Sequence, residues 1–139
     1  MKWEHFILEY RKKACRMIIK IDFNSTEAIY MQLKNQIVVA IAQEKLKEGQ
    51  SLPSVRQMAD ILGVNMHTVN KAYAILREEG YLQLDRRKGA VVAVIPDKDS
   101  EMEALYRDME MLVARGICKG ISKEEMTWLV HSMYEQFGL

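Results

Sequence analysis

The chain has 139 residues, of which 49% are hydrophobic and 28% charged, and its formal net charge is +1. Such values are typical of a soluble globular protein, and the length suffices for one modest domain plus an appendage. No apolar run reaches the ~18 residues of a membrane-spanning helix, and the first residues lack the apolar core of a signal peptide. The sequence therefore predicts a cytoplasmic protein with no membrane partner.

Residues that commonly bind metals or carry catalysis are few and scattered. Cys15 and Cys118 are far apart in the sequence, as are His5, His67 and His131. Their spacing matches no metal-ligand motif, and free thiols are the default for two such cysteines. A glycine-rich phosphate loop and a nucleophile elbow are also missing from the sequence. We therefore predict no enzyme activity, no metal and no cofactor; a metal sensor built from these side chains is the weaker alternative.

The N-terminal part of the chain contains two apolar patterns. Residues 1–16 carry apolar side chains at helical spacing, so we interpret them as a helical extension. Residues 17–22 read as a short extended piece. Asn24 stands three residues before Glu27, which indicates a capping box and hence a helix start. The helix that follows has one apolar side, formed by Tyr30, Leu33, Ile37, Ala40 and Ile41.

Two short helical patterns follow, with a glycine-centred turn between them. Ser54, three residues before Gln57, predicts a capped helix that starts near Val55. Gly63 can adopt the positive φ at which such a helix stops, and Asn65 is a good N-cap for the next helix. That second helix has apolar residues at i, i+3, i+4 and i+7, namely Val69, Ala72, Tyr73 and Leu76. Its opposite side is left free to contact a ligand through Met66, His67, Asn70, Lys71 and Ala74.

A β-hairpin is predicted directly after these helices. Its strands are residues 81–85 and 90–95, and its turn passes through Arg86, Arg87, Lys88 and Gly89. Helix, turn, helix and a basic-tipped hairpin make a winged helix-turn-helix, a shape that fits the major groove of DNA. Without the hairpin, an ordinary helical pair with a solvated polar side would be the commoner interpretation. The expected fold class is mainly α with a small β-hairpin wing, followed by a C-terminal helical hairpin.

Two amphipathic helices are predicted in the C-terminal residues. Gly116 and Gly120 bracket their connection, and Ser122 before Glu125 predicts a capping box. A two-helix hairpin cannot bury apolar stripes this wide by itself, so we expect it to pair with a second copy of the chain. The alternative is that the tail docks against its own N-terminal domain. The expected dimerisation residues are Leu105, Met109, Leu112, Trp128, Leu129, Met133 and Phe137.

Charge is distributed unevenly along the chain. Residues 1–51 carry a net charge of +3, residues 52–95 a net charge of +2, and residues 96–139 a net charge of −4. An acidic tail would not lie against phosphates, so the DNA surface is expected in the front part of the chain. The sequence therefore predicts three regions: an N-terminal extension (1–16), a DNA-binding domain (17–96) and a dimerisation tail (97–139).

Five motifs occur in order along the chain: Ile29-Tyr30-x-Gln32-Leu33, Leu52-Pro53-Ser54-x-Arg56, Leu62-Gly63-Val64-Asn65, Thr68-Val69-x-x-Ala72-Tyr73 and Leu76-x-x-Glu79-Gly80. This ordered set resembles the DNA-binding domain of GntR-family bacterial transcription regulators, from about Ile21 to Val94. The short two-helix tail is similar to that of the YtrA-type subgroup. The resemblance implies dimerisation through the tail and an operon for an ATP-driven transporter as the target. Because this resemblance starts only a few residues after Met17, translation from that methionine is the alternative to an N-terminal extension.

The resemblance and the residue chemistry together indicate a DNA-binding surface. By resemblance, Arg56 contacts phosphates or a guanine, and Thr68 donates to a phosphate. His67, Asn70 and Lys71 are the candidates for reading bases, because Asn pairs with adenine and Lys with guanine in the major groove. The basic turn of the wing enters the minor groove or neutralises phosphate; a solvated turn is the alternative. The complete expected set is Ser54, Arg56, Asn65, Met66, His67, Thr68, Asn70, Lys71, Arg86, Arg87, Lys88 and Gly89.

The function predicted from these features is a homodimeric repressor that binds an inverted-repeat operator. One recognition helix would enter each of two major grooves roughly 34 Å apart. Double-stranded DNA and a second copy of the chain are the expected partners. The alternative is a winged-helix module that binds protein and not DNA. The operator, the regulated genes and any small-molecule effector are not specified by the sequence.

Overall fold

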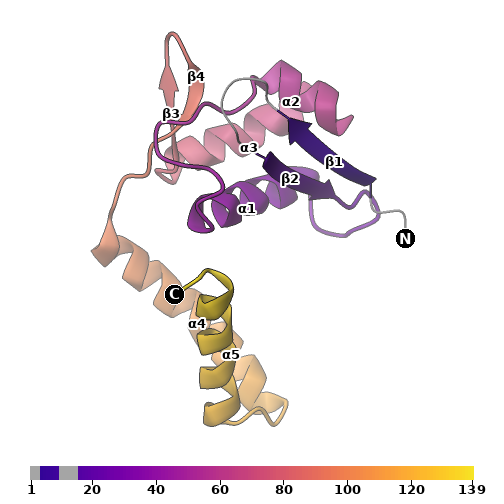
Figure 1. Cartoon of the computed structure of the whole chain (residues 1–139). Helices are drawn as coiled ribbons and strands as arrows, with labels where there is room; N and C mark the ends of the chain where they lie inside the picture. Colours follow the sequence, from indigo (N-terminus) through magenta and orange to yellow (C-terminus); the bar gives the residue numbers. More distant parts are fainter. Residues whose placement is uncertain (1–3, 10–15) are drawn as a thin grey trace. The chain divides into compact units, whose positions relative to one another are not determined.

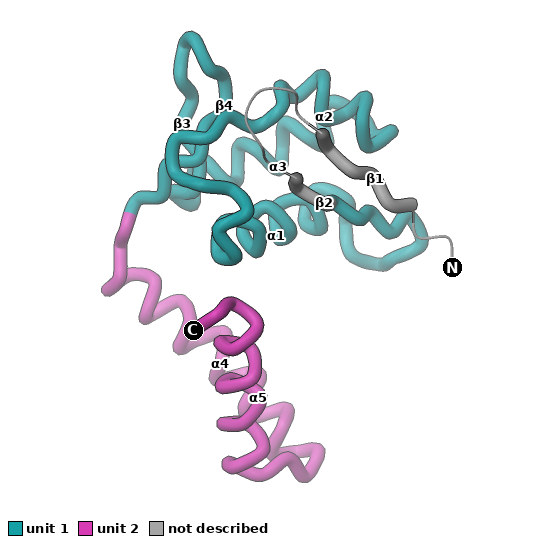
Figure 2. Tube along the Cα trace, in the orientation of Figure 1, with its two compact units in different colours: residues 1–95 teal, residues 96–139 magenta. Residues whose placement is uncertain are grey.

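The computed structural model describes residues 4–9 and 16–139. In chain order they form β1 (Glu4–Glu9), β2 (Arg16–Ile21), α1 (Ile29–Ala42), α2 (Val55–Leu62), α3 (Met66–Glu78), β3 (Leu82–Asp85), β4 (Gly89–Val92), α4 (Lys98–Cys118) and α5 (Lys123–Gln136) (Figure 1). Most of these residues are helical, so the predicted fold class, mainly α with a β-hairpin wing, is confirmed. The chain separates into two compact units, residues 1–95 and residues 96–139 (Figure 2).

The first unit is a helix-turn-helix built around one apolar core. Helices α1 and α2 each pack against α3. The side chains that fill the space between them are fully or almost fully buried, as the alternation of apolar positions predicts. They include Leu33 and Ile37 from α1, Met58 and Leu62 from α2, and Val69, Ala72 and Leu76 from α3. The wing adds Leu82 and Val92 to the same cluster.

Local side-chain bonds fix the ends of α2 and the start of α3. The Ser54 hydroxyl accepts a hydrogen bond from the Gln57 backbone N–H at 3.1 Å, and the Gln57 side chain accepts one from the Ser54 backbone N–H at 3.1 Å. Gly63 ends α2 with φ +66°, and Asn65 caps α3 by accepting from the His67 N–H at 2.8 Å. The predicted capping box, turn glycine and N-cap are therefore confirmed. A cap of this kind stabilises a helix by about 1 kcal/mol.

The predicted capping box at Asn24 is wrong. Helix α1 begins at Ile29, its N-cap is Ala28, and no side chain caps it. A buried glutamine inside α1 holds the preceding loop instead. The Gln32 amide accepts from the Asp22 N–H at 2.9 Å and donates to the carbonyl oxygens of Asp22 and Glu27 at 3.0 and 2.9 Å. Because these partners are five and ten residues away, a motif read at a spacing of three could not find them.

The predicted N-terminal helix is also wrong where the chain is described. Residues 4–9 form β1, which pairs antiparallel with β2 in a register that places Glu4 opposite Ile21 and Glu9 opposite Arg16. The remaining residues of that predicted helix, 1–3 and 10–15, lie outside the described residues. The physical reason is that β2 presents a row of backbone N–H and C=O groups that need partners, and a short apolar run suits a strand as well as a helix.

The extended piece predicted at residues 17–22 is confirmed as β2. Ile19 and Ile21 are buried in the core of the first unit. On the α1 side, the Gln36 amide donates to the Lys20 carbonyl and accepts from the Lys20 N–H. Strand β2 is thus held between β1 and a side chain of α1, which anchors the hairpin to the helical core.

The wing is a two-stranded antiparallel hairpin in which Leu82 pairs with Val92 and Asp85 with Gly89. The segment before α2 adds to its edge. The Leu52 N–H donates to the Ala90 carbonyl and the Val92 N–H donates to the Gln50 carbonyl, both at 2.8 Å. These bonds tie the base of the wing to the chain that enters the helix-turn-helix.

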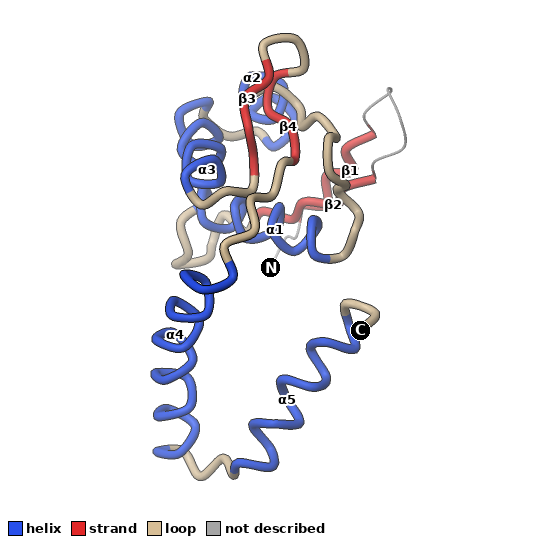
Figure 3. Tube along the Cα trace, turned by 90° about the vertical axis from the view of Figure 1, so that its left-hand side faces the viewer, coloured by secondary structure: helices blue, strands red, loops and turns tan. Residues whose placement is uncertain are grey.

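The second unit contains only α4 and α5. The predicted capping box is confirmed, because the Ser122 hydroxyl accepts from the Glu125 N–H at 3.1 Å and the Glu125 carboxylate accepts from the Ser122 N–H at 2.8 Å. Helix α4 continues through Gly116, where an added Cβ would lie 2.7 Å from the Met126 Cε atom. The two helices approach each other at this end and diverge away from it (Figure 3).

A cavity of about 880 Å³ lies between α4 and α5, lined mostly by apolar side chains such as Met109, Val113, Val130 and Tyr134.

Among the helices in residues 4–9 and 16–139, none combines the length and apolar character needed to cross a membrane.

Candidate nucleic-acid interface

Helix α3 has a buried side and an open side. Val69, Ala72 and Leu76 are completely buried, which fixes the orientation of the helix on the core. The other side carries the predicted DNA-contacting residues of this helix. Met66 at its first position is 49% exposed, and His67, Asn70 and Lys71 are exposed, whereas Thr68 is half-buried. The folding of α3 therefore leaves a mixed apolar and polar surface at its N-terminal half.

The N-terminus of α2 contributes a cation beside this helix. Arg56 is the second residue of α2 and is exposed, whereas Val55 before it is half-buried. Ser54 is exposed as well, and although its oxygen accepts the capping bond, its hydroxyl hydrogen can still donate to a ligand. Asn65 is in the same position, because its carbonyl oxygen caps α3 and its amide NH₂ is the group left to donate.

A buried hydroxyl fixes α3 relative to the start of α2. The Tyr73 hydroxyl donates to the Pro53 carbonyl oxygen at 2.8 Å, and Tyr73 is 5% exposed. Burial raises the pKa of the Tyr73 hydroxyl, so the group is a neutral donor at any physiological pH. This bond ties α3, the predicted recognition helix, to the residue just before the Ser54 cap. Sequence reasoning placed Tyr73 in the apolar stripe and missed the role of its polar end.

Lys71 has a neighbour that sequence reasoning also missed. Its ammonium nitrogen lies 4.0 Å from the ring centroid of Tyr30, the second residue of α1. This is a cation–π geometry, since the ring face carries negative electrostatic potential. Tyr30 belongs to one of the sequence motifs and Lys71 occupies an unspecified position of another, and nothing in the spacing of residues 30 and 71 brings them together.

The tip of the wing is organised by an aspartate. One carboxylate oxygen of Asp85 accepts from the backbone N–H groups of Lys88 at 2.9 Å and Arg87 at 2.7 Å. These two bonds lower the pKa of the Asp85 carboxyl below its ordinary value. Gly89 then adopts φ +73°, a conformation that costs other residues energy.

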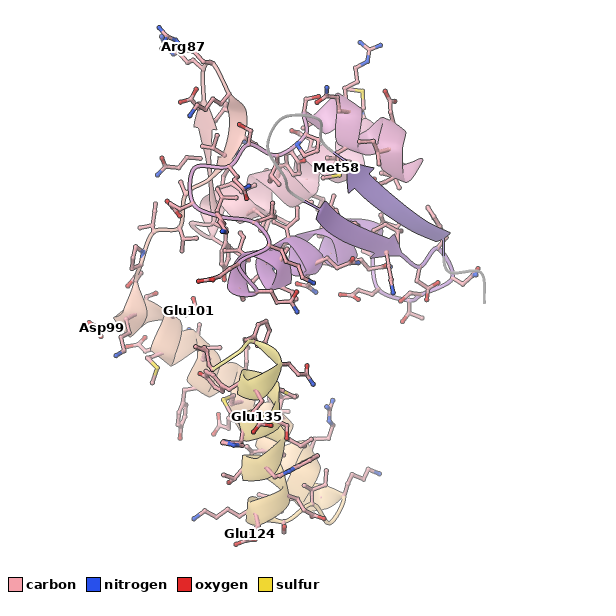
Figure 4. The ribbon with its side chains drawn as sticks, viewed as in Figure 1. Met58, Arg87, Asp99, Glu101, Glu124 and Glu135 are labelled. Atoms are coloured by element: carbon pink, nitrogen blue, oxygen red, sulfur yellow. The ribbon has the colours of Figure 1, made fainter. Side chains whose placement is uncertain are left out.

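This turn presents three cations in sequence, Arg86, Arg87 and Lys88, all exposed. Figure 4 shows Arg87 at the far end of the hairpin, pointing away from the helices. A rigid turn with three adjacent positive charges is suited to contact a polyanion. The residues that the sequence indicated in the wing are thus together at its tip, and those in α2 and α3 are together on the helix-turn-helix.

Acidic residues of the second unit are placed at helix starts. Asp99 and Glu101 lie in the first turn of α4, and Glu124 and Glu125 in the first turn of α5. Negative charge there is stabilised by the helix dipole, so these four carboxylates have a local structural role. Asp99, Glu101 and Glu124 are labelled in Figure 4.

Within the part of the chain that the structure describes, no three His, Cys, Asp or Glu side chains are grouped to hold a metal ion.

Several known proteins are similar to this chain. The family model described as "Bacterial regulatory proteins, gntR family" matches residues 26–92. The uncharacterized HTH-type transcriptional regulator YhcF of Bacillus subtilis (strain 168) is 31% identical over 109 residues, which are 75% of this chain and 88% of YhcF.

Two relatives named YtrA add to this similarity. The HTH-type transcriptional repressor YtrA of Bacillus subtilis (strain 168) is 30% identical over 112 residues, which are 78% of this chain and 86% of that protein. The solved structure of YtrA from Sulfolobus acidocaldarius, a GntR-family transcription factor, matches with a TM-score of 0.56 and 41% identity. That match covers 66% of this chain and 97% of the solved chain.

Proposed function

Since the chain belongs to the GntR family of bacterial regulatory proteins, it is a transcriptional regulator with a DNA-binding domain and not an enzyme, and we propose that it acts as a homodimeric repressor on an inverted-repeat operator. The observation that carries the proposal is the open side of α3, with Arg56 and the basic wing in the same compact unit. A 13-residue helix such as α3 is about 20 Å long, enough to lie in a major groove.

Five residues of this surface have a proposed role in contacting DNA. His67 and Asn70 face outward near the start of α3 and would read base edges, since an asparagine amide can pair with adenine N6 and N7. Met66 would contact a thymine methyl group, which an apolar side chain recognises in the major groove. Arg56 and Thr68 would contact phosphates and set the register of the helix on the duplex.

The wing would add sequence-independent affinity. Arg86, Arg87 and Lys88 form a positive tip that can neutralise phosphate or enter the minor groove. The turn that carries them is held by Asp85 and Gly89, so little ordering of the backbone would accompany binding.

Apolar exposure in the second unit supports dimerisation through the tail. Trp128 is 63% exposed, and Leu105, Leu112 and Met133 are each about half exposed. Single exposed apolar residues are ordinary, but a set of this size on two helices marks an interaction surface. We propose that the tail of a second copy covers it and fills the cavity between α4 and α5. Docking of the tail on its own N-terminal unit remains the competing arrangement.

Repression, the transporter operon and a cytoplasmic location belong to the same proposal. Repression is supported by the name of the Bacillus subtilis relative, a transcriptional repressor. The operon follows from the YtrA-type resemblance of the short tail, and the location from membership of a family of bacterial regulators that act on DNA. A small-molecule effector has no assigned site here.

The test is selection of bound sequences from random duplexes, followed by titration of salt on the best site. We expect two half-sites about one helical turn apart, and affinity that falls steeply as salt rises. A protein-interaction module would select no sequence and show no such salt dependence.

Two variants sharpen the division between helix and wing. Asn70→Ala should cost about 1–3 kcal/mol and relax preference at one base position per half-site. Lys88→Ala should weaken binding to all sequences alike and reduce the salt slope. Identical behaviour of the two variants across a set of operator mutants would contradict these roles.

A further inference from the structure

The contact between Lys71 and Tyr30 joins the reading helix to α1. The ammonium nitrogen lies 4.0 Å from the centroid of the ring. Tyr30 is half-buried and packs against the core, so its ring is held in place by its surroundings. Lys71 is exposed, and its long side chain would otherwise sample many rotamers. The Tyr30 ring therefore restricts the Lys71 ammonium to one position on the proposed DNA-binding surface.

The contact with Tyr30 sets the direction of the Lys71 side chain. Asn70 and Lys71 are consecutive on α3, so their side chains leave the helix about 100° apart. Helix α1 packs on α3, and the lysine head group lies over the α1 residue Tyr30. Lys71 is thus displaced to the flank of the reading helix, to the side where α1 begins, and away from the direction that Asn70 takes.

We propose that Tyr30 is a positioning residue of the DNA interface, which holds the Lys71 ammonium for a backbone phosphate and away from the guanine that the sequence alone suggests for it. The proposal rests on the proposed DNA-binding function. A helix in the major groove meets base edges along its outward centre and phosphates along the groove walls at its flanks. A lysine ammonium is a compact point charge that suits a phosphate oxygen.

Four variants of the full-length chain test this: Tyr30→Leu, Tyr30→Phe, Lys71→Ala, and Tyr30→Leu combined with Lys71→Ala. Leucine keeps apolar bulk but removes the ring face, whereas phenylalanine keeps the ring and removes only the hydroxyl. Affinities are measured on the selected operator and on its single-base variants, over a series of salt concentrations. Thermal unfolding of each variant controls for loss of fold.

The pairing predicts a specific pattern. Tyr30→Leu should weaken binding about two- to fivefold on every operator alike, the equivalent of one cation–π contact at an exposed site. Tyr30→Phe should bind as the unmodified chain does. Lys71→Ala should also weaken all operators alike and reduce the salt slope by about one. In the Lys71→Ala background, Tyr30→Leu should have no further effect, because the two residues act through one contact.

A spectroscopic measurement covers the case in which Tyr30→Leu loses stability. The ε-methylene protons of Lys71 should show an upfield ring-current shift in the unmodified chain and in Tyr30→Phe. If the ε-methylene protons of Lys71 in the unmodified chain have the ordinary chemical shift of a lysine, the proposal is overturned without any variant.

Other outcomes would also overturn it. Additive losses in the double variant, equal losses for Tyr30→Leu and Tyr30→Phe, or a Lys71→Ala loss confined to one base position would each do so. These failures leave the proposed function intact, because they require DNA binding to be measured. Absence of salt-dependent binding by the unmodified chain would instead overturn the proposed function and this inference together.

Discussion

The two compact units differ in where their apolar side chains lie. In the first unit, large residues from all three helices, including Leu33, Ile37, Met58 and Leu76, have no exposed surface. In the second unit, Gly116 is the one buried residue of α4, and α5 has none. Burial of apolar area is the main favourable term in folding, so the first unit has a larger source of stability within its own chain than the second. The difference supports the proposal that DNA recognition and dimerisation belong to separate units.

Removal of the tail should have the largest effect on operator binding. A chain cut after Ile95 should keep the fold of the first unit, because its core contains no residue of α4 or α5. It should be monomeric and bind the inverted repeat about 10²–10⁴-fold more weakly, because two linked modules raise the local concentration of the second one. Sedimentation at micromolar concentration and a shift assay at fixed salt measure the two effects.

A point variant controls for the deletion. Leu129→Asp in the full-length chain should act like truncation, since burying an unpaired carboxylate in an interface is strongly unfavourable. Lys123→Ala at the start of α5, an exposed site, serves as the neutral match. A full-length chain that sediments as a monomer, or a dimer that survives truncation, would show that the tail does not assemble the protein.

Two substitutions that each shorten a large apolar side chain to alanine should affect the stability of the two units differently. Leu76 has no exposed surface, so Leu76→Ala should lower the free energy of unfolding of the first unit by about 2–5 kcal/mol. Met133 is 54% exposed, and Met133→Ala should change the unfolding of one isolated chain by less than about 0.5 kcal/mol. Urea unfolding at two protein concentrations measures both effects. If Met133 lies in a dimer interface, the stability change caused by Met133→Ala should depend on protein concentration. The stability change caused by Leu76→Ala, which acts on the core of the first unit, should not.

Much of the first unit could be predicted because its signals are local. The Ser54–Gln57 box, Gly63 and Asn65 each act within three residues, and the structure has all three. The buried stripe of α3 follows from the helical period alone. The basic wing tip could be placed because β-branched residues follow a turn that ends in glycine. These features do not depend on what the rest of the chain does.

The features that were missed depend on partners far away in the sequence. Strand β1 forms because β2 offers it an edge, and Gln32 replaces the expected Asn24 cap by reaching back to Asp22. Tyr73 reaches Pro53 across 20 residues, and Lys71 meets Tyr30 only because α1 and α3 pack together. Periodicity indicates which side of an element is buried, but it does not indicate which polar group lies opposite.

Tyr73→Phe should have a moderate effect on the first unit. The loss of one buried hydrogen bond, which leaves the Pro53 carbonyl oxygen without its partner, should cost about 1 kcal/mol of unfolding free energy. The pH dependence has a definite sign. Burial raises the pKa of Tyr73 above its ordinary value of 10.0, so its contribution is complete below pH 10 and is lost as the pH rises beyond that value. Urea unfolding between pH 7 and pH 11 should therefore show a decline for the unmodified chain that is smaller in Tyr73→Phe.

Asp85 should give the smallest effect, and one confined to the wing. Hydrogen bonds from the backbone N–H groups of Lys88 and Arg87 lower the pKa of this carboxyl, so the turn is stabilised above the ordinary value of 3.8 and loses that stabilisation as the pH falls through the lower, folded value. In NMR spectra, the amide protons of Arg87 and Lys88 should shift with pH at a midpoint below 3.8, and Asp85→Asn should abolish that titration. Asparagine keeps an acceptor oxygen and removes a negative charge from the positive tip, so Asp85→Asn should bind DNA slightly more tightly at neutral pH. Asp85→Ala removes the acceptor as well, and it should bind more weakly than Asp85→Asn. If the alanine and asparagine variants bind equally, the shape of the turn has no part in DNA binding, and the three cations act by charge alone.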